Sequence, residues 1–286
     1  MSHPHHRIPA PQTRIARALA RALLPAEERA RAARLRFHDA GHGYDTFGLH
    51  PDWVAAGLGL FHFLYEHYFR VESQGHEHLP SEGPAILVAN HSGTLPFDAV
   101  MLYLDVERHT EPPRVPRPIG DRFIPLLPFA STILARAGAT PGTRENLRHL
   151  LESGEMVLIF PEGTPAVGKP FSQRYRLQEW RVGHAETAIA HGVPIIPAAV
   201  IGAEEQWPQI ARLPIALFGA PYLPLPLTPF PLPVRYHLRY GAPIRFDLPP
   251  EAATRPDVVR DAAAQVKAAV EALIAEGLRE RKGIFQ

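Results

Sequence analysis

The 286-residue sequence contains no cysteine, and no apolar run in it has the character of a membrane-spanning helix. The absence of cysteine excludes disulfides, zinc–thiolate sites and a cysteine nucleophile. The longest uncharged run, residues 213–234, contains seven prolines. Such a segment cannot satisfy its backbone hydrogen bonds in lipid. The first residues, MSHPHHRIPAPQTR, are polar, so no secretory signal is expected.

The net charge of the chain is small, but positive charge is concentrated near its N-terminus. The net charge is only +1, yet residues 1–39 contain eight arginines against Glu27, Glu28 and Asp39. This basic arm carries +5 and leaves −4 for the rest, which points to an anionic surface as its partner. The arm lacks the interleaved aromatic residues of a nucleic-acid stacking platform. We therefore expect an anionic membrane surface as the partner, and no nucleic acid.

The arm is expected to be partly helical. Residues 13–24 place three arginines on one helical face and three large apolar residues largely on another: Arg14, Arg17 and Arg21, and Ile15, Leu19 and Leu23. Such a helix suits the headgroup region of a membrane, or it docks on the body of the protein, and the pattern leaves both open. We assign residues 1–45 to this arm and residues 46–286 to one domain.

The rest of the chain alternates between strand and helix patterns. Hydrophobic residues make up 45% of the sequence, enough for a substantial core. Residues 85–89, AILVA, form a continuous apolar run, as a strand buried on both faces requires. The further expected elements are strands at 156–160 and 195–201, helices at 97–104, 144–153, 182–191 and 257–281, and an edge strand at 234–240. The order predicts an α/β fold with a mainly parallel, mixed-edge sheet flanked by helices on both faces.

Two segments with side chains that could take part in catalysis follow predicted strands. His91 lies just past the strand 85–89, and Asp98 is seven residues further on. A carboxylate bonded to one ring nitrogen fixes the tautomer of an imidazole and leaves the other nitrogen as a base. The segment FPEGT, residues 160–164, follows the next strand with a turn and a carboxylate. Because parallel strands end at the same edge of a sheet, both segments are expected at one site.

Together, four ordered segments between residues 69 and 246 resemble the PlsC-type glycerolipid acyltransferases. NHSGTLPFD is similar to the first family block, which implies His91 as catalytic base and Asp98 as its partner. GATPGTR places Arg144 at an acceptor-binding position. FPEGT implies that Glu162, Gly163 and Thr164 bind the acceptor. VPIIPAAV is similar to the fourth block, a structural strand.

The sequence departs from the family pattern at two places. The usual spacing is His-x4-Asp, whereas six residues separate His91 and Asp98 here. Seven helical steps leave two positions about 20° apart, which makes the longer spacing tolerable. Pro165 stands where members that bind a phosphorylated acceptor usually carry arginine. Four basic residues follow that either bind phosphate or form a solvated face: Lys169, Arg174, Arg176 and Arg181.

The resemblance implies transfer of an acyl group from acyl-CoA or acyl carrier protein to a hydroxyl of a glycerolipid or lysophospholipid. The donor is a substrate, and we expect no cofactor and no metal; the histidine clusters HPHH and HEH lie in a polar tail and near a turn. The abundant proline, alanine and arginine favour a bacterial source, with the protein peripheral or monotopic at the cytoplasmic side of the inner membrane. Two alternatives remain: a metal-dependent hydrolase using His91, Asp98 and Glu162, and a non-catalytic membrane-associated lipid-binding protein.

Overall fold

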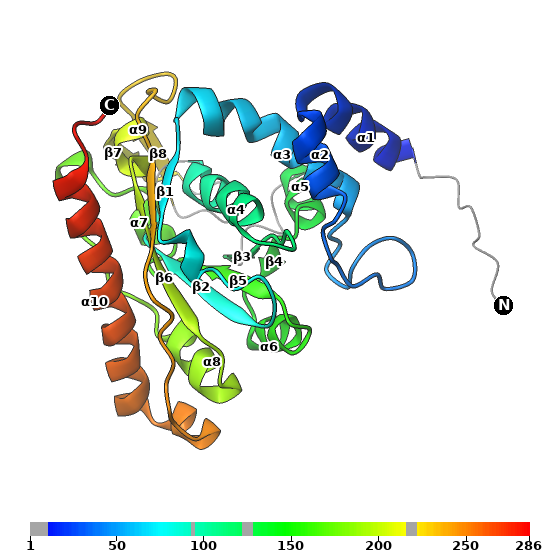
Figure 1. Ribbon diagram of the computed structural model, residues 1–286. Coiled ribbons are helices and arrows are strands. Elements are labelled where there is room, and N and C mark those ends of the chain that lie inside the picture. The colour runs from blue at the N-terminus through cyan, green and yellow to red at the C-terminus, as the bar shows by residue number, and fades with distance from the viewer. Residues whose placement is uncertain (1–10, 93–94, 122–127, 216–221) are drawn as a thin grey trace.

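The computed structural model describes residues 11–92, 95–121, 128–215 and 222–286 (Figure 1). The first ten residues of the predicted arm lie outside this range. The helices are α1 (Pro11–Leu23), α2 (Ala26–Ala32), α3 (Pro51–Phe63), α4 (Phe97–His109), α5 (Ala130–Arg136), α6 (Arg144–Glu152), α7 (Thr164–Val167), α8 (Gly183–His191), α9 (Ala203–Gln206) and α10 (Pro256–Glu280). The strands are β1 (Glu72–Gln74), β2 (Ala85–Ala89), β3 (Arg117–Gly120), β4 (Thr140–Pro141), β5 (Met156–Ile159), β6 (Ile195–Ile201), β7 (Gln209–Leu213), β8 (Leu223–Pro226) and β9 (His237–Tyr240).

Seven of these strands form one sheet in the order β1-β9-β6-β2-β5-β3-β4. The strands from β6 to β4 pair in parallel, with β2 between β5 and β6 at its centre. Strand β9 pairs antiparallel with β6 and parallel with β1. The predicted α/β fold with a mainly parallel, mixed sheet is therefore confirmed. A separate hairpin is formed by β7 and β8.

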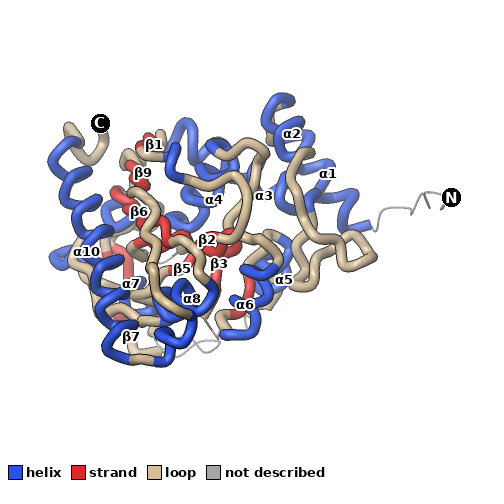
Figure 2. The backbone as a smooth tube through the Cα atoms, turned by 60° about the horizontal axis from the view of Figure 1, so that its bottom comes forward, coloured by secondary structure: helices blue, strands red, loops and turns tan. Residues whose placement is uncertain are grey.

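The central strand shows why the apolar runs lack alternation. In β2, Ala85, Leu87 and Ala89 pack into a core with residues of α3 and α4. Ile86 and Val88 face the other side, into a core with residues of α6, α8 and α10. All five residues are fully buried. Helices therefore cover both faces of the sheet, and every residue of its central strand must be apolar (Figure 2).

The structure corrects the predicted edge strand at residues 234–240, a range that contains β9. Strand β9 lies inside the sheet, because β1 covers its outer side. Its alternation is real, with Leu238 and Tyr240 buried, but the polar face is only partly exposed to solvent. Arg239 is also buried, and it pairs with Glu276 of α10 at 3.2 Å. The long C-terminal helix thus neutralises a charge that the sequence pattern assigned to solvent.

The N-terminal arm packs against the body of the protein. Helix α1 lies beside α3, at the end of the molecule away from α10 (Figures 1 and 2). Ala16 and Ala20 are buried in this contact. A Cβ atom on Gly59 of α3 would lie 3.1 Å from Cβ of Leu23, so the close approach depends on glycine. The docked helix that the sequence left open is therefore present.

Docking uses the small residues of α1 and leaves its large ones outside. Ile15, Leu19 and Leu23 remain 59%, 41% and 43% exposed. Four of the seven arginines in the described part of the arm, by contrast, pair with acids of the body: Arg17 with Asp52, Arg31 and Arg34 with Glu111, and Arg36 with Glu82. Within α1, Arg14 and Arg21 are exposed and have no ion-pair partner among the described residues. Helix α1 thus exposes an apolar stripe and two unpaired arginines.

Candidate active site

The centre of the site is a histidine–aspartate pair at the carboxyl end of β2. His91 Nδ1 lies 2.6 Å from Asp98 Oδ2, and Asp98 is fully buried in the first turn of α4. The same carboxylate oxygen accepts a hydrogen bond from the Ser92 backbone N–H at 2.9 Å. The second oxygen accepts one from the Ala99 N–H at 2.8 Å. The carboxylate is therefore held in place by two backbone N–H donors and has one ring nitrogen as its third partner.

The pair forms for a different reason than helical spacing. Residues 90–92 are neither helix nor strand, and α4 begins only at Phe97, so His91 and Asp98 do not share a helix face. The chain turns back after β2, and the start of α4 brings Asp98 to the imidazole. Asn90 anchors the end of the strand, because its side chain bonds to both the N–H and the carbonyl of Val200 in β6. The pairing therefore does not depend on helical spacing.

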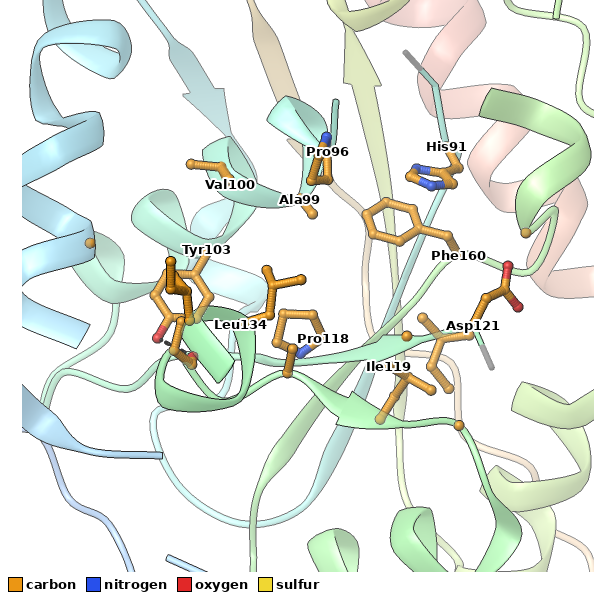
Figure 3. A pocket seen from close by; sticks show the side chains of 18 of the residues that line it. His91, Pro96, Ala99, Val100, Tyr103, Pro118, Ile119, Asp121, Leu134 and Phe160 are labelled. Atoms are coloured by element: carbon orange, nitrogen blue, oxygen red, sulfur yellow. Dashed lines mark hydrogen bonds between the residues drawn. The ribbon is translucent and has the colours of Figure 1, made fainter. Parts of the chain in front are cut away.

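The imidazole is fixed on its other side by an aromatic ring. Phe160, which follows β5, stacks on His91 with ring centroids 4.4 Å apart and planes 25° apart (Figure 3). With Nδ1 directed at Asp98, Nε2 has no partner among the described residues, and the ring lines the adjacent cavity. The bond to a carboxylate keeps the proton on Nδ1 in the neutral ring and leaves Nε2 as the acceptor. This is the arrangement of a general base.

The environment of His91 favours its protonated form. Burial on its own lowers the pKa of the ring, but the charge of Asp98 and its hydrogen bond outweigh this effect. Glu162 and Asp121 act in the same direction. The pKa of His91 therefore lies above its ordinary value of 6.5, which makes the ring a stronger base.

Glu162 braces the site from within. Its side chain is buried, and one carboxylate oxygen accepts a hydrogen bond from the His91 backbone N–H at 3.1 Å. The other accepts one from the Gln178 N–H at 2.7 Å. The carboxylate thus ties the loop after β2 to the segment that leads into α8, and Glu162 does not belong to the cavity lining. This geometry indicates a positioning role, whereas the sequence had implied acceptor binding.

The turn after Glu162 carries a polar cluster that faces the cavity. Thr164 Oγ1 donates a hydrogen bond to Asp121 Oδ2 at 2.6 Å, and Arg181 Nη1 lies 2.8 Å from Asp121 Oδ1. A Cβ atom on Gly163 would lie 3.1 Å from the Arg181 guanidinium carbon, and Gly163 has φ of +58°. Glycine is therefore required both by the turn and by the guanidinium above it. Gly163, Thr164, Asp121 and Arg181 all line the cavity.

The other three basic residues, for which substrate binding and a solvated face were both left open, lie elsewhere. Lys169 is buried, and its Nζ lies 3.0 Å from Glu204 and bonds to the Arg176 carbonyl. Arg174 stacks on Phe171 and lies 3.7 Å from Glu205. Arg176 is exposed, and none of the three lines the cavity. Substrate binding in this cavity is therefore not supported for these three residues, because acidic residues of α9 pair with Lys169 and Arg174.

Arg144 stands at the rim of the site. It is the first residue of α6, whose amino end is capped by the Thr143 side chain bonded to the Asn146 N–H. The side chain is 87% exposed, lines the cavity and pairs with Glu186 of α8 at 2.8 Å. Its position at a helix amino end is compatible with contact to a polar substrate group, as the sequence implied.

The cavity beside His91 has a volume of about 900 Å³. Its lining is mainly apolar and includes residues from the sheet, α3, α4 and α5, among them Val100, Ile119 and Leu134 (Figure 3). Leu19 and Leu23 of α1 and Leu60 of α3 also line it, so the cavity reaches the exposed apolar stripe of the arm. Cavities of this size accommodate extended small molecules.

Sequence reasoning missed two residues of this site. Asp121 directly follows β3, so it stands at the same edge of the sheet as His91 and Glu162. The strand RPIG is short and contains proline, and for this reason it gave no clear strand pattern. Phe160 was visible as the residue before the PEG turn, but its stacking on His91 depends on the tertiary fold.

The geometry bears on the alternative chemistries. The oxygens of Asp98 and Glu162 accept hydrogen bonds from N–H donors, so these carboxylates are arranged to receive donors and not a cation. Within the described parts of the chain, no group of three or more His, Asp or Glu residues is placed to hold a metal ion. A serine nucleophile needs an adjacent base, and Ser92 Oγ is buried without a partner among the described residues; it is the Ser92 backbone N–H that bonds to Asp98. Over the same residues, no helix combines the length and apolar character needed to cross a membrane.

Known proteins with similar sequences indicate the family to which this chain belongs. The family model described as Acyltransferase matches residues 70–201. An uncharacterised protein of Mycobacterium tuberculosis is 35% identical over 257 residues, which cover 85% of this chain and 72% of that protein. A human protein named DGAT1/2-independent enzyme synthesizing storage lipids is 29% identical over 209 residues, covering 71% of this chain and 60% of that protein.

Among solved structures, the fold is similar to that of the 1-acyl-sn-glycerophosphate (LPA) acyltransferase PlsC from Thermotoga maritima. The TM-score is 0.51 at 16% sequence identity, over 81% of this chain and 83% of that chain. The shared fold agrees with the family match, which includes both His91 and Glu162. The chain belongs to the PlsC-type acyltransferase family.

Proposed function

We propose that this acyltransferase moves a fatty acyl group from an acyl thioester, acyl-CoA or acyl carrier protein, to a hydroxyl of a glycerolipid or lysophospholipid. The observation that carries the proposal is the His91–Asp98 pair, 2.6 Å apart, at the wall of a mainly apolar cavity of about 900 Å³. The base can activate a hydroxyl, and the apolar cavity can hold the acyl chain whose thioester that hydroxyl attacks. We assign no cofactor to this reaction.

In the proposed mechanism, His91 Nε2 accepts the proton of the acceptor hydroxyl. The hydroxyl oxygen then attacks the thioester carbonyl carbon, and the tetrahedral intermediate collapses with loss of the thiolate. The proton on His91 passes to the thiolate, which leaves as the thiol. Asp98 keeps the ring in the required tautomer and stabilises the transient imidazolium. Phe160 and the Glu162 brace hold the ring at its position.

The test is transfer by the purified full chain with His91→Ala. We expect turnover to fall by roughly 10²–10⁴-fold, the usual contribution of a general base, with the melting temperature little changed. His149→Ala is the matched control, because His149 is an exposed histidine of α6 outside the cavity. Undiminished transfer by His91→Ala contradicts the mechanism. Lipid analysis of a host that expresses each variant identifies the product class, and a protein that only binds lipid would leave the host lipids unchanged.

We also propose that α1 and α3 rest on an anionic lipid surface and open the cavity toward it. Leu19, Leu23 and Leu60 are exposed and line the cavity, and Phe63 of α3 is 59% exposed. Amphipathic helices with apolar stripes of this kind bind at the headgroup boundary. Arg14 and Arg21, the unpaired arginines of α1, are available to anionic headgroups. The protein would then take lipid substrates directly from the membrane as a peripheral enzyme.

A further inference from the structure

The charged residues of the cavity show an unusual balance for a site that receives a phosphate. Among the described residues of the lining, the two arginines are each bonded to an acid: Arg181 to Asp121 at 2.8 Å, and Arg144 to Glu186 at 2.8 Å. The fixed charges of this lining therefore cancel. A phosphate that gives up water needs uncompensated positive charge in return.

The other basic groups that the structure describes near this lining do not change the balance. At Pro165, the position after the Gly–Thr turn, the backbone carbonyl accepts a hydrogen bond from Arg212 Nη2 at 3.0 Å. Arg212 also donates to the Gly168 carbonyl and is not among the lining residues. Lys169 is directed away, into its pair with Glu204. The guanidinium above Gly163 is thus that of Arg181, and its charge is already neutralised by Asp121.

Asp121 retains its negative charge in this setting. Burial on its own would raise its pKa, but hydrogen bonds from Thr164 and Arg181 outweigh burial and keep the pKa below its ordinary value. Its carboxylate accepts two bonds from Thr164 and one from Arg181. A carboxylate offers about four acceptor positions, so one remains for a further donor. Arg181 likewise keeps N–H groups beyond the one bonded to Asp121.

The pair is therefore suited to a neutral group that both donates and accepts. Asp121 can accept the hydrogen of a hydroxyl, while Arg181 donates to a hydroxyl or ester oxygen. Asp121 lies on the same side of the cavity as His91 and Phe160 (Figure 3). Its charge also repels an anion that approaches Arg181.

We propose that the Asp121–Arg181 pair selects an uncharged glyceride with a free hydroxyl as acceptor, over an acceptor that carries a phosphate. This inference rests on the proposed acyl transfer and names its acceptor class. Asp121 acts here as the specificity-determining residue, because it cancels the charge that a phosphate would otherwise use.

The experiment compares two acceptors that share one acyl chain, monooleoylglycerol and oleoyl lysophosphatidate, in the same mixed micelles with oleoyl-CoA as donor. The measured quantity is the ratio of kcat/KM for the uncharged acceptor to that for the phosphorylated acceptor. For the wild-type chain we expect a ratio above one. In Asp121→Asn, the arginine is no longer neutralised, and the ratio should fall about two- to fivefold.

Two further variants separate this effect from a loss of structure. Arg181→Gln leaves Asp121 uncompensated, so the ratio should rise instead of falling. Asp257→Asn is the matched control, because it removes the same charge from an Asp–Arg pair, Asp257 and Arg255 at 2.9 Å, outside the cavity. The shift in Asp121→Asn should shrink at high ionic strength, since Arg181 is 66% exposed. A structural defect would not reverse sign between the variants or depend on salt in this way.

The outcomes are distinct. Wild-type preference for the phosphorylated acceptor, or an unchanged ratio in both Asp121→Asn and Arg181→Gln, overturns the inference and leaves the proposed transfer standing. No turnover of either acceptor by the wild-type chain refutes the proposed function and the inference together. A shift of the same size in Asp257→Asn would show that general surface charge, and not this pair, sets the preference.

Discussion

Substitution of Asp98 by asparagine tests the core of the proposed mechanism. The three hydrogen bonds that Asp98 receives all run from donors, namely His91 Nδ1 and the N–H groups of Ser92 and Ala99. An asparagine has one oxygen and one NH2 group, so it cannot accept at both positions. If the NH2 group faces His91 and Ser92, the ring must accept at Nδ1 and carry its proton on Nε2. That tautomer cannot act as the base.

The opposite orientation of the amide has a different cost. The oxygen then serves His91 and Ser92, and the NH2 group meets the Ala99 N–H with no acceptor between them. A buried unsatisfied donor costs about 1–3 kcal/mol. Even in this orientation the ring loses the charge that stabilises the imidazolium. We therefore expect kcat to fall by roughly 10²–10⁴-fold, with little change in KM.

The assay is release of free thiol from oleoyl-CoA by the purified chain in mixed micelles, with kcat and KM measured separately and a melting curve for each variant. Asp105→Asn is the matched control: Asp105 is a second fully buried aspartate of α4, bonded to Tyr240 and Ser73 outside the cavity. We expect it to lower the melting temperature while kcat stays within a few-fold of wild type. If Asp98→Asn changes only KM, or lowers kcat no more than Asp105→Asn does, the tautomer argument fails.

Three further predictions follow from the same contacts. Because the pKa of His91 is raised and only the neutral ring accepts a proton, kcat/KM should increase with pH through an inflection above 6.5, and an inflection at or below 6.5 would contradict this. The linked stability has the opposite sign: the stabilisation from protonated His91 is fully present below pH 6.5 and is lost as pH rises through the raised pKa. Glu162→Gln should lower both kcat and the melting temperature, since one of its two backbone bonds is lost at about 1–3 kcal/mol, whereas a rise in KM alone would instead assign it to acceptor binding. Replacing both unpaired arginines of α1 by glutamine should lower the affinity for anionic vesicles, measured by co-sedimentation, about tenfold at low salt. The same change at Arg34 and Arg36, which are paired with acids of the body, should weaken it less, and equal losses would refute the α1 contact.

Much of the site could be located from local patterns alone. The apolar runs at 85–89 and 156–159 are buried strands, and a parallel sheet brings their carboxyl ends to one edge. His91 and Glu162 follow those strands directly, so their proximity is a consequence of strand order. Which face of α1 is buried was harder to predict from the sequence, because small and large apolar residues both fit a helical stripe. Only the close approach at Gly59 decides which of them dock.

The sequence by itself determined the layered α/β fold and the residues at the ends of its strands, because periodicity and strand order are local properties of a chain. The tertiary structure alone decided which partner each charged side chain takes. Lys169 is withdrawn by Glu204, Arg181 is neutralised by Asp121, and Arg239 is buried against α10. These pairings join residues 35 to 60 positions apart, and a charge carries no periodic signal of the neighbour that will neutralise it.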